Sequence, residues 1–86
     1  MKNTALKERK VNEPYEVWTY GSWVWQVLKK WQADDNKPYG RWLCAVQSEN
    51  TSPGYDLGDV YVSEVKDTAH KVWSEGDGTL PKEYRF

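Results

Sequence analysis

The sequence predicts a mainly β fold: a five-stranded antiparallel meander curled into a small barrel. The chain has 86 residues, which gives room for one domain. Its apolar segments are short, rich in valine, tyrosine and tryptophan, and separated by turn-forming residues, a pattern typical of strands. The connections are short as well, so successive strands should pair antiparallel, and a sheet of this size hides its edges by curling.

Each predicted strand lies between turn or loop signals. Pro14 ends a polar segment just before the first strand, and Gly21-Ser22 is short enough for a tight turn after it. Stretches 33–40 and 48–58 contain proline and glycine and form the next two loops. The predicted strands are 15–20, 23–32, 41–47, 59–63 and 70–74.

Two stretches also fit a helix. Val24, Val27, Leu28 and Trp31 recur at helical spacing behind Ser22, which could cap a helix. Apolar residues in 62–72 have nearly the same spacing. The tryptophan and valine content of the first stretch favours a strand, and the second has room for a single turn between strands. One short helix therefore remains an alternative within the meander.

The two ends of the chain predict segments outside the domain. Residues 1–13 are polar and charged and predict a flexible N-terminal arm, and residues 75–86, with two glycines and a proline, predict a flexible C-terminal tail. The small β domain is expected at 14–74. The chain begins without the apolar run of a secretion signal, so we expect a cytoplasmic protein with no membrane segment.

Charge is distributed unevenly along the chain. Residues 1–46 hold eight basic and five acidic side chains, a net charge of +3, and residues 47–86 hold four basic and eight acidic ones, a net charge of −4. A nucleic-acid-binding domain usually has a larger basic excess. The asymmetry permits a local basic patch without predicting one.

The sequence offers little for catalysis. Cys44 and His70 are the only pair of residue types that could form a nucleophile and its base. Cys44 stands among apolar residues, where a thiol packs as a small hydrophobic group. One cysteine and one histidine cannot supply a structural zinc site. We therefore expect a non-enzymatic protein without catalytic residues, metal or cofactor.

Two acidic stretches are predicted to be turns. Residues 34–36 (Asp-Asp-Asn) offer oxygen ligands, but Lys37 and Pro38 follow where a calcium loop needs glycine. Asp56 and Asp59 are predicted to cap a turn rather than to form a catalytic pair. Neither stretch predicts a metal site.

Alternation with period two assigns two faces to the second strand. The face with more apolar area should point inward, together with Trp42, Cys44 and Val46 of the next strand. The inward residues of the second strand are then Trp23, Trp25, Val27, Lys29 and Trp31. The outward surface carries Val24, Leu28, Leu43 and Ala45, bordered by Lys30, Arg41 and Gln47.

Two resemblances extend this interpretation. The stretch GDVYVSEVKDTAHKV after RWLCAV resembles the end of an SH3-like barrel, where a strand, a tight helical turn and a closing strand follow one another. Because the acidic loop and proline-flanked tyrosine of peptide-binding SH3 domains are missing, this implies shape only. The blocks YEVW, GSWVWQVLKKWQADDNKPYGRW and LGDVYVSEVK are similar to small uncharacterised bacteriophage proteins, which implies binding to one host or phage macromolecule inside a bacterial host.

The outward apolar surface predicts a binding function, because such a surface needs a cover. The arm, or Leu80, Tyr84 and Phe86 of the tail, could fold back over it. Otherwise we expect a protein-binding module that inhibits or redirects a bacterial host protein, or that pairs with itself as a homodimer. The predicted contact residues are Val24, Leu28, Lys30, Tyr39, Arg41, Leu43 and Tyr55.

Binding of single-stranded nucleic acid is the alternative. Small barrels bind such strands by stacking bases on aromatic side chains inside a basic groove. The sequence interleaves these residue types at Lys29, Lys30, Trp31, Lys37, Tyr39, Arg41 and Trp42. The acidic C-terminal half weakens this alternative, since phosphate contacts supply most of such affinity.

Overall fold

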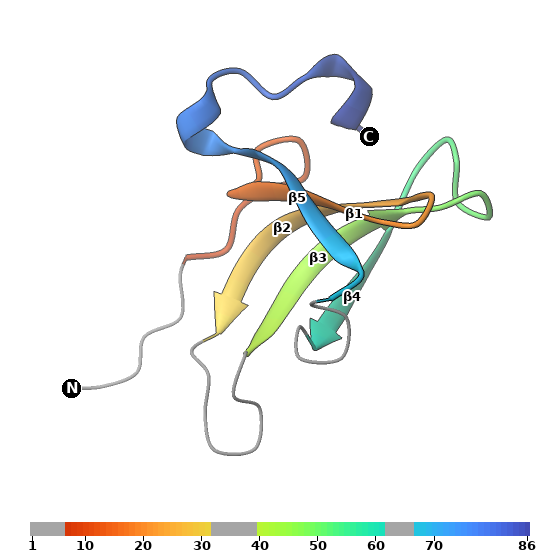
Figure 1. Cartoon of the computed structure of the whole chain (residues 1–86), viewed down its shortest axis with the longest axis horizontal. Coiled ribbons are helices and arrows are strands. Elements are labelled where there is room, and N and C mark those ends of the chain that lie inside the picture. The colour runs from red at the N-terminus through yellow and green to blue at the C-terminus, as the bar shows by residue number, and fades with distance from the viewer. Residues whose placement is uncertain (1–6, 32–39, 62–66) are drawn as a thin grey trace.

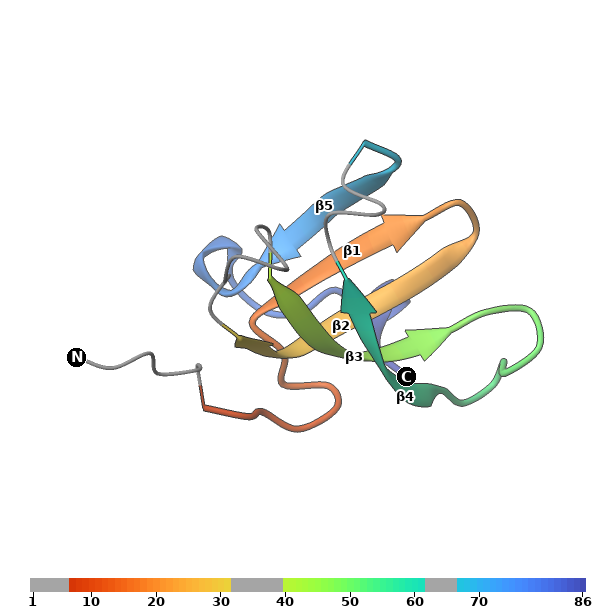
Figure 2. The same cartoon turned by 90° about the horizontal axis from the view of Figure 1, so that it is seen from below.

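The structure, a computed structural model, describes residues 7–31, 40–61 and 67–86. Its strands form one antiparallel sheet in the order β4-β3-β2-β1-β5 (Figure 1), and the sheet is strongly curved (Figure 2). The predicted mainly β class is therefore confirmed. The elements are β1 (Glu16–Tyr20), β2 (Trp23–Trp31), β3 (Arg41–Gln47), β4 (Asp56–Tyr61), β5 (Ala69–Ser74) and the short 3₁₀ helices η2 (Glu75–Asp77) and η3 (Lys82–Tyr84).

The tryptophan-rich segment is a strand and not a helix. β2 runs through the middle of the sheet and pairs with β1 on one side and β3 on the other. Gly21 has a φ of 61°, which glycine adopts without strain, and this allows the tight turn from β1 to β2. Val62 and Val65 of the second helical alternative lie outside the described residues, while Ala69 and Val72 belong to β5.

The sheet has a hydrophobic cluster on each face. We call one the inner face; its buried side chains are Trp25, Val27, Trp42, Cys44 and Ala69. The inward orientation predicted for alternate residues of β2 and β3 is confirmed at these positions. Trp23, at the start of β2, lies at the margin of this cluster: its ring is 6.1 Å from that of Tyr20, which packs against the cluster, and it is 44% exposed.

The opposite, outer face is covered by the C-terminal segment. Leu80 is buried there in a cluster with Val17 and Trp73, against which Val24 and Tyr84 also pack. Figure 1 shows this segment crossing the sheet after β5. Residues 75–86 were predicted as a flexible tail, and the structure instead shows the alternative in which the tail folds back over the outward surface.

A buried polar group ties both ends of the chain to this face. The side chain of Gln26 is fully buried; its oxygen accepts the main-chain N–H of Asn12 at 2.5 Å, and its amide donates to the carbonyl of Tyr84 at 2.8 Å. The side chain of Asn12 in turn binds both main-chain groups of Phe86. Because buried polar groups need partners, these bonds fix where each terminal segment crosses β2.

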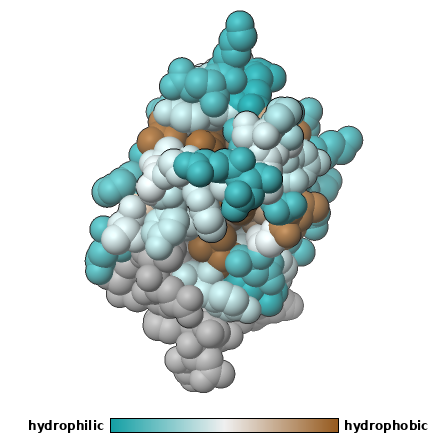
Figure 3. Space-filling view, turned by 90° about the vertical axis from the view of Figure 1, so that its right-hand side faces the viewer, coloured by the Kyte–Doolittle hydropathy of each residue, from teal (hydrophilic) through white to brown (hydrophobic). Residues whose placement is uncertain are grey.

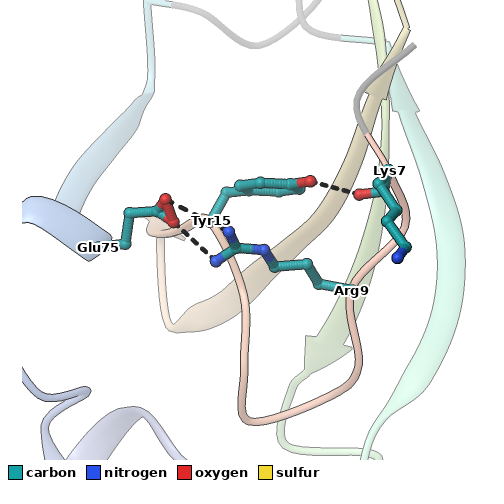
Figure 4. A network of polar contacts seen from close by, with 4 residues as sticks. All are labelled: Lys7, Arg9, Tyr15 and Glu75. Atoms are coloured by element: carbon teal, nitrogen blue, oxygen red, sulfur yellow. Dashed lines mark hydrogen bonds and ion pairs between the residues drawn. The ribbon is translucent and has the colours of Figure 1, made fainter.

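The N-terminal segment is fastened at a second point (Figure 4). The guanidinium of Arg9 lies 4.0 Å from the ring centroid of Tyr15 and 2.7 Å from a carboxylate oxygen of Glu75. The Tyr15 hydroxyl donates to the carbonyl of Lys7, and the main-chain N–H of Arg9 donates to the carbonyl of Leu28 at 2.8 Å. Residues 7–13 are therefore packed along the domain, although the sequence predicts a flexible arm.

A bulge interrupts the long second strand. Val27 pairs with Cys44 and Lys29 pairs with Leu43, which leaves Leu28 without a partner residue in β3. One extra residue shifts the two-residue alternation by one position, so side chains beyond it change faces. The last three residues of β2 therefore point opposite to the predicted directions.

Candidate binding surface

The predicted outward apolar surface is mostly covered. Leu28 is 2% exposed and Ala45 is fully buried. Val24 packs against the cluster beneath the C-terminal segment, and Leu43 is half-buried. The central part of the predicted contact surface is therefore largely buried within the domain, and Leu80 and Tyr84 of the C-terminal segment supply the cover over Val24.

The bulge places Lys30 on the inner face. Its ammonium group lies 4.4 Å from the ring centroid of Trp42 and 2.9 Å from a carboxylate oxygen of Glu16. The same oxygen accepts the indole N–H of Trp18 at 2.8 Å. This corrects the outward orientation predicted for Lys30. Its ammonium group covers one face of the Trp42 ring, and Trp42 is buried.

The same bulge places Trp31 on the outer face, which corrects its predicted inward orientation. The guanidinium of Arg41 lies 3.8 Å from the ring centroid of Trp31, and the ammonium of Lys29 lies 4.9 Å from it. Nε of Arg41 is 3.9 Å from a carboxylate oxygen of Asp59. Three residues of the predicted nucleic-acid site are thus together, while Lys37 and Tyr39 lie outside the described residues.

Exposed apolar side chains remain beside the edge strand β4. Leu57 is 60% exposed and Tyr55 is 42% exposed. The rings of Tyr55 and Phe86 are stacked with their centroids 6.0 Å apart. Leu57 pairs with Ala45 of β3 and so belongs to the outer face. We call Tyr55, Leu57 and Phe86 the edge patch.

The sequence identifies only one member of the edge patch. Tyr55 is in the predicted contact set, whereas Leu57 was missed because Asp56 and Asp59 were interpreted as caps of a turn. Both aspartates lie in β4, which pairs with β3 from Asp56 to Tyr61. The predicted strand at 59–63 begins three residues later than β4 does. Alternation of Tyr55, Leu57 and Asp59 on one side of an extended segment is the sequence pattern that would have identified Leu57.

The groups considered for catalysis do not meet. Cys44 is buried on the inner face, and burial raises the pKa of its thiol to about 12, only partly offset by the charge of Lys30. His70 is exposed on β5, where it pairs with Thr19. Within the described ranges, no three histidine, cysteine, aspartate or glutamate side chains lie close enough to hold a metal ion. Residues 34–36 are outside those ranges.

Comparisons with known proteins add no relative. Models of known families, curated proteins and solved structures were compared with this chain, and none matched it. In the part of the chain that the structure describes, no helix is long and apolar enough to span a bilayer.

Proposed function

We propose that this protein is a non-enzymatic protein-binding module that contacts its partner through the edge patch. One observation carries the proposal: outer-face apolar side chains are covered on the central strands and exposed beside β4, where Leu57 is 60% exposed. Contiguous apolar residues at a polar border are typical of contact sites. Tyrosine is enriched among residues that dominate binding energy.

A small number of anchors suits this molecule. Figure 3 shows one side of the protein, where hydrophobic areas are small and separated by hydrophilic ones. Burying one large apolar side chain stabilises a complex by about 1.5–3 kcal/mol. Leu57 and Tyr55 are 60% and 42% exposed, so each contributes part of this amount, and the patch suits a small contact surface whose remaining affinity comes from polar contacts.

The phage resemblance extends the proposal to a role. A small phage protein that binds and inhibits or redirects a bacterial host protein needs a stable fold and one contact surface. Cys44 is buried on the inner face while His70 is exposed on β5, so the one nucleophile–base pair that the sequence suggested is not formed, and we favour binding over catalysis.

The test compares two exposed apolar positions on opposite edges of the sheet. Leu57→Glu alters the edge patch on β4, and Val72→Glu alters β5, where Val72 is 39% exposed. Each full-length variant is used to capture partners from the native host, with quantitative mass spectrometry and circular dichroism. A protein retained by wild type and by Val72→Glu but lost by Leu57→Glu supports the edge patch. Equal retention by all three folded proteins contradicts it.

Binding of single-stranded nucleic acid is a second candidate, supported by the gathering of Lys29, Trp31 and Arg41 on the outer face. Bases stack on such indole rings while cations contact phosphates. An oligonucleotide titration followed by tryptophan fluorescence tests it. Quenching that weakens as salt rises, and that is lost in Arg41→Gln but not in Lys71→Gln, supports this candidate. An unchanged signal at low salt excludes it.

A further inference from the structure

β4 has the properties of an open strand edge. It is the last strand on its side of the sheet (Figure 1), and among the described residues no other strand pairs with it beyond β3. Its ladder with β3 runs from Asp56 to Tyr61 without a register shift. β5, at the other edge, has a bulge opposite Val17 and Trp18. Bulges protect edges against further pairing, so β4 is the edge left regular.

Gly58 lies in the middle of this edge, and nothing in the described part of the fold requires a glycine there. Its φ is not in the left-handed region that favours glycine, and a Cβ placed there would meet no atom within 4 Å. Glycine inside a strand weakens the strand. Such a glycine is typical of a place where another chain or ligand approaches closely, and the space that its side chain would occupy is open.

The charges along β4 select the kind of chain that fits. From residue 42 to residue 65 the sequence has four acidic and no basic side chains. Two of them, Asp56 and Asp59, are exposed on β4, and Asp59 has a cation nearby, Nε of Arg41 on β3 at 3.9 Å. A second copy pairing edge to edge would bring these carboxylates together, which is unfavourable. Complementarity therefore favours a segment with lysine or arginine.

We propose that β4 binds an extended, basic segment of a partner protein as a sixth strand, with a large apolar side chain lying over Gly58. This inference rests on the proposed function and specifies its partner. Strand addition gives affinity through main-chain hydrogen bonds and specificity through alternate side chains. The order Asp56, Leu57, Gly58, Asp59 calls for basic, apolar, apolar and basic residues in either strand direction.

The probe is a blocked octapeptide with Lys-Tyr-Tyr-Lys at its centre, titrated into the isotopically labelled full chain and followed by NMR. Exchange of main-chain amides on β4 is expected to slow, with no change on β5. Replacing both probe lysines by glutamate, or the protein's Asp56 and Asp59 by asparagine, is expected to weaken binding about tenfold or more at low salt. No binding up to about 1 mM peptide overturns the inference.

Two further measurements isolate strand pairing from contact by side chains. N-methylation of alternate peptide residues, in two complementary patterns, removes the hydrogen bonds of one edge while retaining the side chains. One pattern is expected to abolish binding. Gly58→Val is expected to raise the urea midpoint of unfolding and to weaken the peptide about tenfold, with Gly58→Ala as a milder variant. Gly76→Val is the matched control, since a Cβ at Gly76 also meets nothing.

The outcomes separate this inference from the proposed function. If both N-methyl patterns bind like the parent peptide while Leu57→Glu still loses its captured partner, strand addition is wrong and the edge patch stands. If Leu57→Glu also retains every partner and the peptide, both fail. A concentration-dependent dimer that protects the amides of β4 in sedimentation and exchange measurements contradicts the basic partner in favour of a second copy.

Discussion

The side chain of Asn12 pairs with both main-chain groups of Phe86, 74 residues away. Its Oδ1 accepts the N–H of Phe86 at 2.7 Å, and its Nδ2 donates to the Phe86 carbonyl at 3.0 Å. The same Oδ1 accepts the amide of the buried Gln26 at 3.0 Å. One asparagine thus joins the N-terminal segment, the C-terminal segment and the central strand, and with them the Phe86 ring of the edge patch.

Substitution of Asn12 separates its hydrogen bonds from its backbone conformation. Asn12 has a φ of 72°, which glycine adopts easily and alanine does not. Asn12→Gly is expected to lower the free energy of unfolding by about 1–3 kcal/mol because three hydrogen bonds are lost. Asn12→Ala is expected to cost about 1 kcal/mol more. Urea denaturation measures both, and Asn50→Ala in an exposed loop is the control. Equal losses at Asn12 and Asn50 would contradict this role.

The strands were predictable because their signals are local. Valine and aromatic content with alternation located β1, β2, β3 and β5 within one residue at each end. The inward set Trp25, Val27, Trp42 and Cys44 followed from apolar area alone. The start of β4 was predicted three residues too late, at residue 59, because an aspartate–glycine stretch has the composition of a turn. Pairing with β3 keeps this stretch extended.

The candidate site was less predictable because it depends on contacts distant in sequence. No local pattern marks Leu28 as an extra residue in the ladder between β2 and β3. The sequence therefore predicts Lys30 outward and Trp31 inward, the reverse of the faces on which they lie. The burial of Gln26 depends on partners 14 and 58 residues away. Leu28 is buried and so does not belong to the exposed surface, whereas Tyr55 is 42% exposed and remains on it.

Leu80 and Leu57 should differ sharply as stability determinants. Leu80 of the C-terminal segment is buried against Val17 and Trp73, so Leu80→Ala leaves a cavity and is expected to lower the free energy of unfolding by about 2–4 kcal/mol. Leu57→Ala changes an exposed side chain and is expected to stay within about 0.5 kcal/mol of wild type. Urea titrations of the two variants decide this. Similar losses would mean that the C-terminal segment does not pack as described.

Lys30 and Lys29 test the bulge, since they are adjacent in sequence and lie on opposite faces. Lys30→Ala removes the ion pair with Glu16 and the contact with Trp42, and a partly buried carboxylate then loses its cation. The expected loss is about 1–2 kcal/mol. Lys29→Ala removes a contact with Trp31 and is expected to cost at most about 0.5 kcal/mol. A larger loss of stability for Lys29→Ala than for Lys30→Ala in urea denaturation would contradict the bulge, because in a regular strand Lys29 would point inward and Lys30 outward.

The thiol of Cys44 makes stability depend on alkaline pH. Burial raises its pKa from 9.0 to about 12, so the folded protein holds the proton in a range where the unfolded chain releases it. The protonated thiol makes its full contribution to the free energy of unfolding below about pH 9. This contribution is lost as pH rises toward 12, by at most about 1.4 kcal/mol per pH unit.

Comparison with Cys44→Ala isolates this effect, because the two proteins share every other titratable side chain. The difference in the free energy of unfolding between the two proteins should be constant below about pH 8 and should shift in favour of Cys44→Ala above about pH 9. A thiol reagent at about pH 8 should label Cys44 only as fast as the protein opens. A constant difference up to about pH 11, together with rapid labelling of the folded protein, would show that the thiol is not buried on the inner face.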